Sequence, residues 1–223
     1  MHNLIADNLI KIRESIGAAC ASSGRVPGSV KILAATKTVG ADRINLLPSC
    51  DIMLAGENRV QEFLAKYDAV DNDIEWHFIG SLQTNKVKQV IDKVTLIHSI
   101  DRPSLADEIQ RQSESLGRIT EVLIEINGGN ESSKSGVSPE QLEALYQYVC
   151  PKPHIRVIGF MPVLPIKAPE RLYATMESVF KSYQTRDPRI CELSMGMSGD
   201  YEIAIRHGAT IVRLGSCLFG KRE

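Results

Sequence analysis

Three features of this sequence could act together on a phosphorylated carbonyl compound. Lys37 lies at the end of the β-rich run 30–36, where its amine could form a Schiff base with an aldehyde. Ser198 lies in the glycine turn "GMSGD", and Gly215 and Ser216 lie in the turn "GSCLFG". Turns that lead into helices expose backbone N–H groups, which attract anions. The combination predicts a site that holds a phosphate at one end and a carbonyl at the other.

Arg213 stands inside the otherwise apolar run "ATIVRLG" at 209–215. An arginine stays charged in essentially any protein environment, so burying it requires an acceptor. That acceptor is either a core carboxylate such as Glu125 or a ligand at the end of the strand, and the pattern leaves both open. A lysine amine condenses with an aldehyde in its neutral form, and nearby cations and partial burial generally favour that form.

The chemistry of this set fits pyridoxal 5′-phosphate (PLP), which carries one aldehyde and one phosphate. It fits another phosphorylated carbonyl compound equally well, as in an aldolase. The structural alternatives are a strand-end lysine that only reaches solvent and ordinary turns with Ser198 or Asp200 as helix N-caps. The five histidines show no metal-ligand spacing. We expect His77 and His98 to be hydrogen-bonded core residues and no metal to be bound.

The elements that must position these residues alternate between short β-rich runs and amphipathic helical patterns. The eight strand candidates are 30–36, 51–56, 76–80, 94–100, 119–127, 155–161, 190–196 and 209–215. Helical patterns cover 104–117, which ends at Gly117, and 168–184. A third covers 138–150, with Ser138 as N-cap and Pro139 at the first helical position. Eight such units favour a single (β/α)8 TIM barrel over a doubly wound open sheet.

The chain of 223 residues shows no linker or composition shift that would divide it. We therefore expect one domain over residues 1–223, with an N-terminal helix over 1–24 packed on the barrel. The formal net charge of −1 gives no support to a nucleic-acid or membrane-surface role, and no apolar run could span a bilayer. The five cysteines show no CxxC spacing, which is typical of a reduced, cytoplasmic protein.

Seven motifs in order between residues 31 and 221 resemble the YggS/PROSC family, the PLP homeostasis proteins. They are "AATKTV", "GENRVQE", "WHFIGSLQTNK", "HSID", "EINGGNESSKSG", "LSMGMSGDYEIAI" and "VRLGSCLFG". The resemblance implies a barrel of the alanine racemase N-terminal type with PLP as its cofactor. It also implies the roles of the site residues: Lys37 forms the Schiff base, Ser198, Gly215 and Ser216 hold the phosphate, Arg213 faces the pyridine nitrogen, and Asn58 lies near the ring.

The chain departs from the usual family pattern in two places. Gly199 stands where many members have aspartate or alanine, and "GFMPVLP" replaces a Met-Ala-Ile or Met-Thr-Met type of sequence after the sixth strand. The first departure preserves Ser198, while the second puts the neighbours of the ring on that side in question. Lys134, in the loop "SSKSG", is a further cation that could approach the ligand.

The function expected from these residues is binding rather than catalysis. An arginine opposite the pyridine nitrogen disfavours its protonation, which makes the ring a poor electron sink. The resemblance also implies a barrel without the second domain of alanine racemase, which supplies the far-face tyrosine and builds the dimer. We expect a monomer that holds PLP reversibly for intracellular PLP homeostasis, with little or no turnover and no catalytic residue. It would pass PLP to PLP-requiring apoenzymes. The alternative is a racemase-like PLP enzyme acting on amino acids.

Overall fold

Eight parallel strands close into a barrel in sequence order, and β8 pairs with β1 to complete it. The computed structural model describes residues 2–220 apart from 27, 72 and 130–134. The strands are β1 Lys31–Ala35, β2 Leu54–Glu57, β3 Glu75–Phe78, β4 Leu96–Ile100, β5 Thr120–Asn127, β6 Ile155–Val163, β7 Glu192–Met197 and β8 Ile211–Leu214. The predicted barrel is therefore confirmed, and the open sheet is excluded.

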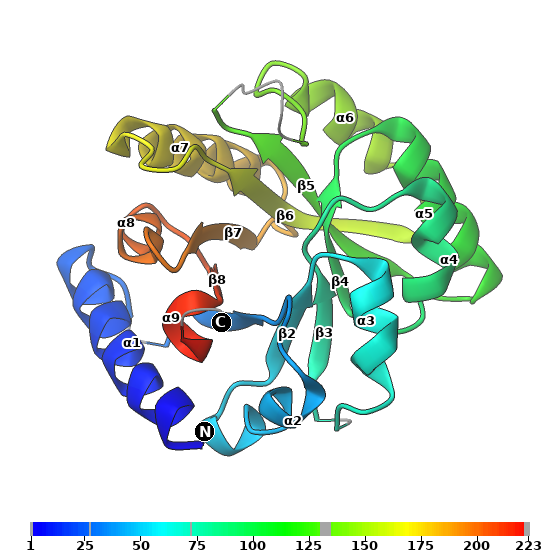
Figure 1. Ribbon diagram of the computed structural model, residues 1–223. Helices are drawn as coiled ribbons and strands as arrows, with labels where there is room; N and C mark the ends of the chain where they lie inside the picture. Colours follow the sequence, from blue (N-terminus) through cyan, green and yellow to red (C-terminus); the bar gives the residue numbers. More distant parts are fainter. Residues whose placement is uncertain (1, 27, 72, 130–134, 221–223) are drawn as a thin grey trace.

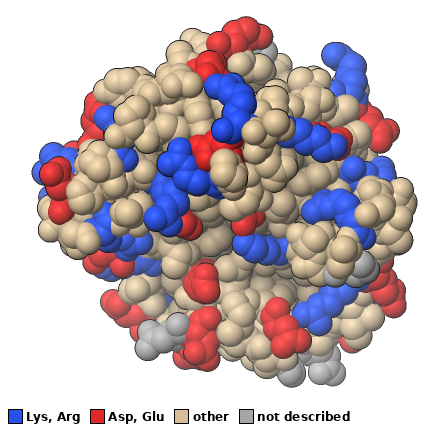
Figure 2. All heavy atoms as spheres, turned by 180° about the vertical axis from the view of Figure 1, so that it is seen from behind, with Lys and Arg blue, Asp and Glu red and all other residues tan. Residues whose placement is uncertain are grey.

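Helices surround the barrel on its outside (Figure 1). They are α1 His2–Ser22, α2 Ala41–Ile44, α3 Val60–Tyr67, α4 Val87–Val90, α5 Pro103–Ser115, α6 Leu142–Val149, α7 Glu170–Arg186, α8 Tyr201–Arg206 and α9 Ser216–Phe219, with 3-10 turns at Pro48–Cys50 and Thr84–Lys86. In the part of the chain that the structure describes, no helix is long and apolar enough to cross a membrane. On the face opposite to Figure 1, basic and acidic side chains are interspersed (Figure 2).

The predicted N-terminal helix is present as α1, and it lies beside α8 and α9 (Figure 1). Its apolar residues recur at helical spacing, and Ile5, Leu9 and Ile12 are buried. The Asn8 side chain donates a hydrogen bond of 3.0 Å to the carbonyl of Leu218 in α9. The helix thus supports the short α9, which begins at one of the predicted phosphate turns.

Two apolar layers position the site. One lies between the strands and the helices, and the other fills the inside of the barrel with residues such as Leu33, Leu123 and Ile211. Successive side chains of a strand point to opposite faces, so residues two apart share a face. Glu125 follows Leu123 on the inner face of β5, and Arg213 follows Ile211 on the inner face of β8. Both therefore rise from the barrel core towards the carboxyl ends of the strands.

Two predicted boundaries differ from the structure in ways that concern the site. The helix expected from Ser138 begins only at Leu142, because the preceding segment is bound to the sheet. Val137 forms an isolated parallel bridge with Ile126, and its N–H donates to the Glu125 carbonyl at 2.9 Å. A turn at 138–141 follows before the helix starts. The second error concerns β6, which continues to Val163 and not only to Met161, where the predicted strand ends. By contrast, Gly117 has a φ of 62° just after α5, as predicted.

Candidate functional site

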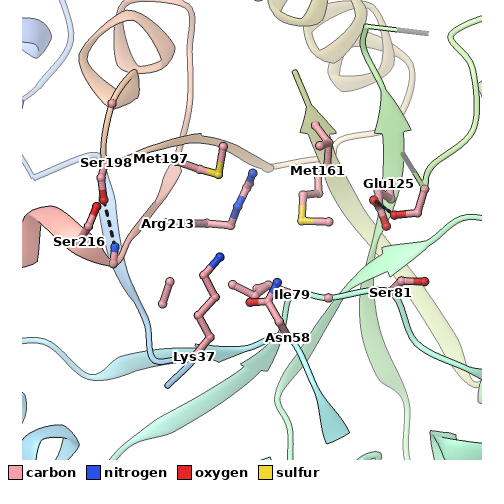
Figure 3. A pocket seen from close by; sticks show the side chains of 16 residues that line it. Lys37, Asn58, Ile79, Ser81, Glu125, Met161, Met197, Ser198, Arg213 and Ser216 are labelled. Carbon is pink, nitrogen blue, oxygen red and sulfur yellow. Dashed lines mark hydrogen bonds between the residues drawn. The ribbon is translucent and has the colours of Figure 1, made fainter. Parts of the chain in front are cut away.

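A pocket of about 400 Å³ lies at the carboxyl ends of the strands, and all the site residues predicted from the sequence line it. They are Lys37, Asn58, Ser198, Arg213, Gly215 and Ser216. These residues come from β8 and from the loops after β1, β2, β7 and β8. The barrel therefore brings together positions that are up to 179 residues apart in the chain, as Lys37 and Ser216 are. The close-up of the pocket shows their arrangement (Figure 3).

Lys37 is half-buried in the turn after β1, and its side chain points towards Arg213 (Figure 3). Its amine forms no hydrogen bond to any residue that the structure describes. The backbone around it is fixed, because the Thr36 N–H donates to the Gly56 carbonyl at 3.0 Å and the Val39 N–H to the Thr36 carbonyl at 2.9 Å. Thr38 adopts a left-handed φ of 65°, which is strained for a β-branched residue. This turn holds rigidly an amine to which no described residue is hydrogen-bonded.

A buried ion pair beneath the turn holds it in place. The Lys66 ammonium donates to Glu57 Oε1 at 2.7 Å and to the carbonyls of Thr36 and Val39, each at 3.0 Å. Glu57 is fully buried, and its Oε1 also accepts a bond of 2.7 Å from the Thr36 hydroxyl. Its Oε2 accepts from the Asn58 N–H at 3.2 Å. The loops after β1 and β2 are therefore tied together by one carboxylate and one ammonium.

Asn58 is positioned from the other side by Gly80. A Cβ atom at Gly80 would lie 2.1 Å from the carbonyl oxygen of Asn58, closer than two non-bonded atoms can approach. Only glycine at this position lets the loops after β2 and β3 come so close together. The Asn58 side chain consequently borders the pocket next to Lys37 (Figure 3).

The start of α9 collects the hydrogen-bond donors expected of an anion site. The Ser198 hydroxyl accepts hydrogen bonds from the N–H groups of Gly215 at 3.2 Å and Cys217 at 3.3 Å. Ser216 is the first residue of α9, where helix N–H groups have no carbonyl partner within the helix. Asp200 does not compete for these donors, because its two oxygens accept bonds of 2.6 Å from the Met197 N–H and the Tyr173 hydroxyl.

Arg213 is only 8% exposed and is held by an acceptor that the sequence did not suggest. Its Nη1 donates to the Ser194 carbonyl at 2.5 Å and to the Ser194 hydroxyl at 2.9 Å. The structure shows no ion pair between Arg213 and Glu125 among the residues described. Burial lowers the pKa of Arg213 to about 10, and the negative charges of Asp200 and Glu125 act in the opposite direction. The guanidinium is therefore charged at neutral pH beside the pocket.

Two buried histidines continue this hydrogen-bond chain into the barrel. His98 Nδ1 lies 3.0 Å from the Ser194 hydroxyl, and His98 Nε2 lies 3.0 Å from His77 Nδ1. Burial lowers the pKa of His98 well below 6.5, and His77 and Arg213 lower it further. Burial and the nearby Lys31 lower the pKa of His77 to about 4. Both histidines are hydrogen-bonded core residues, as predicted, and both are neutral at physiological pH.

The neutral state of His77 predicts a loss of stability in mild acid. In the unfolded chain this histidine is protonated below about pH 6.5, whereas in the folded chain it is protonated only below about pH 4. The contribution of His77 to the free energy of unfolding is therefore fully present above pH 6.5 and is lost as the pH falls towards 4. Urea unfolding should show a loss of about 2 kcal/mol from this residue between pH 7.5 and 5. His77→Gln should flatten that part of the profile, and an equally steep profile would contradict this interpretation.

The comparisons with known proteins agree with this geometry. A family model for the alanine racemase N-terminal domain matches residues 20–223. The chain is 45% identical to the pyridoxal phosphate homeostasis protein of Aquifex aeolicus, over 97% of this chain and 98% of that protein. It is 38% identical to the protein of the same name from Escherichia coli K12, over 99% of this chain and 98% of that protein.

The chain belongs to the pyridoxal phosphate homeostasis protein family. Among solved structures, it is similar to PipY of Synechococcus elongatus PCC7942 with PLP bound. The TM-score is 0.83 at 30% sequence identity, over 97% of this chain and all of PipY. The family that the seven motifs indicate is therefore confirmed, together with its barrel.

The structure also adds pocket residues that the sequence analysis did not select. Glu125, Ser135 and Met161 line the pocket, as does Ser81 after β3. The alternation of β5 could have indicated Glu125, because its neighbour Leu123 belongs to the barrel interior. Met161 ends the predicted strand 155–161, and its residue type alone did not mark it as a pocket residue. Lys134 lies outside the described residues.

Proposed function

We propose that this chain, as a single domain over residues 1–223, binds PLP reversibly through Lys37 and serves PLP homeostasis. The observation that carries the proposal is that three features line one pocket: a lysine amine that no described residue binds, a buried arginine and the donors at the start of α9. The family relationship supports it, since the relatives carry this name. The PLP-bound state of the similar protein PipY supports it as well.

The residues present fit PLP in size and in chemistry. The pocket of about 400 Å³ lies in the range of ordinary small-molecule sites. Ser198, Gly215 and Ser216 would hold the phosphate through a hydroxyl and backbone N–H groups. Arg213 would face the pyridine nitrogen, and Asn58 would border the ring. Lys37 would make the covalent link to the aldehyde carbon.

The same residues favour holding PLP over using it for catalysis. When bound, PLP supplies an aldehyde and a ring that withdraws electrons from a substrate carbon. The charged guanidinium of Arg213 opposes a proton on the ring nitrogen and so weakens this withdrawal. We propose that release of PLP to PLP-requiring apoenzymes, by a monomer, completes the function.

The direct test is a titration of PLP-free chain with PLP. We expect one PLP per chain, a visible absorbance band from the lysine link, and retention of the colour through gel filtration. Incubation of the loaded chain with L-alanine should yield no D-alanine above the rate with free PLP. A colourless, PLP-free chain after gel filtration would contradict the binding proposal, and efficient racemisation would contradict the absence of turnover.

Removal of the Ser198 hydroxyl should act chiefly through the phosphate. Ser198→Ala leaves the N–H groups of Gly215 and Cys217 without their acceptor. This loss should lower the free energy of unfolding by about 1 kcal/mol. It should weaken PLP binding about tenfold. Binding of pyridoxal, the same aldehyde without the phosphate, should change little. Equal effects on both ligands would show that Ser198 does not contact the phosphate.

A further inference from the structure

The pocket continues beyond the residues that the proposed function uses. In Figure 3, Ser198 and Ser216 lie at one end and Glu125 at the other, with Arg213 and Lys37 between them. Glu125 is only 3% exposed. Its Oε1 accepts a hydrogen bond of 2.6 Å from the Ser135 hydroxyl. Its Oε2 is buried without a hydrogen bond to any residue of the described chain.

An unpartnered buried carboxylate oxygen is unfavourable and therefore indicates a missing ligand or partner. Among the described residues, the charged groups that act on the pKa of Glu125 do not bind this oxygen. Arg213, from β8, directs its hydrogen bonds to Ser194. Asp101, after β4, is paired with Arg102 at 2.5 Å. Rotation about the terminal bond of Glu125 has a broad, twofold profile, so either oxygen can turn towards the pocket.

The surroundings of Glu125 favour its protonated form more than water does. Burial raises the pKa of its carboxyl, and the negative charge of Asp101 acts in the same direction. The Ser135 hydrogen bond and the charge of Arg213 lower the pKa, but the net direction is upward. A carboxylate with a raised pKa is a better base than an exposed one.

We propose that Glu125, oriented by Ser135, recognises the primary ammonium group of an amine that takes PLP from Lys37. The proposal rests on the proposed function and names the class of acceptor for the same site. An ammonium group offers three N–H donors and a positive charge, which match a buried carboxylate with a free oxygen. A small amine bound at Glu125 would stand on the side of Lys37 opposite to the phosphate donors.

The exchange balances without a redox partner. The incoming ammonium gives one proton to Glu125, which later returns it to solvent. The nitrogen of the resulting amine then bonds to the carbon that Lys37 holds, and the bond from that carbon to the Lys37 nitrogen breaks. The two remaining protons of the incoming amine pass to Lys37, which leaves as a free amine. Its side chain is then available for another PLP.

The first arm of the test uses the PLP-free full chain. Ethylamine should raise the melting temperature of the wild type, whereas ethanol, which has the same carbon skeleton without the charge, should not. Glu125→Gln should lose the response to ethylamine, and Ser135→Ala should weaken it. Glu121→Gln is the matched control, because Glu121 lies on the same strand in an exposed pair with Arg156, and it should respond like the wild type.

The second arm follows PLP release from fully loaded chain after addition of ethylamine. The release rate should saturate with ethylamine concentration in the wild type and in Glu121→Gln. In Glu125→Gln the half-saturating concentration should rise about tenfold or more. A parallel series uses Nα-acetyl-lysine amide in place of ethylamine. If Glu125→Gln raises its half-saturating concentration as well, the site accepts protein lysines. If only the ethylamine series changes, the site accepts free amines.

Failure of the inference can be separated from failure of the proposed function. If the chain takes up no PLP, the proposed function fails, and the melting arm still shows whether Glu125 binds an ammonium group. If PLP is taken up but Glu125→Gln melts and exchanges like Glu121→Gln, only the assignment of Glu125 is overturned.

Discussion

Lys37→Ala is expected to abolish the covalent retention of PLP. The phosphate donors at the start of α9 and the Arg213 guanidinium remain in this variant, so PLP can still bind but can form no bond to the turn after β1. The visible band should disappear, and gel filtration should strip the cofactor. Lys37→Arg should behave in the same way, because it keeps the positive charge and loses the amine that condenses with an aldehyde.

Lys88→Ala is a suitable control for this experiment, because Lys88 is exposed on α4 and away from the pocket. It should retain both the band and the bound PLP. Persistence of the band in Lys37→Ala would show that another amine carries the link, and Lys134 would be the next lysine to replace.

The second large effect is expected from Lys66→Met, which breaks the buried ion pair beneath Lys37. Glu57 is fully buried, so removal of the ammonium leaves a charge that water cannot reach. The carbonyls of Thr36 and Val39 lose their donor at the same time. We expect the free energy of unfolding to fall by about 3 kcal/mol or more in urea titrations. PLP binding should weaken as well, because these carbonyls belong to the turn that presents Lys37.

A double-mutant cycle separates the ion pair from general packing. In a Glu57→Gln background no buried charge is left over, so Lys66→Met should have a clearly smaller effect there. Lys181→Met serves as a comparison, since Lys181 pairs with Glu177 at the same distance of 2.7 Å but is 67% exposed. Its loss should cost about 0.5 kcal/mol or less. Equal losses of unfolding free energy in Lys66→Met and Lys181→Met would contradict the role of Lys66 in holding the turn that presents Lys37.

The fold was largely predictable because parallel strands leave a strong sequence signal. Each is a short apolar run that ends in polar or glycine-rich residues. The apolar runs do not show that the sheet closes into a barrel, because closure depends on the pairing of β8 with β1. Ser138 shows the limit of local signals. The Ser-Pro pattern is typical of a helix N-terminus, but the hydrogen bond from the Val137 N–H to the Glu125 carbonyl keeps this segment at the sheet, and the helix begins only at Leu142.

The pocket residues were predictable where a polar residue ends a strand, as at Lys37 and Asn58. The supporting contacts were not, because they join distant segments. Nothing near Arg213 in the sequence indicates that Ser194 accepts its hydrogen bonds, or that His98 follows in the same chain of contacts. Glu125 was considered only as a partner of Arg213, since its unsatisfied oxygen becomes visible only when the surrounding side chains are placed.

The lysine that carries the link can be identified directly. Borohydride treatment of the PLP-loaded chain makes the carbon–nitrogen bond permanent, and peptide mass mapping then locates it. The account predicts a single modified site, at Lys37, in native chain and no specific site after unfolding. Modification of a different lysine, or labelling spread over many lysines in the native chain, would contradict it.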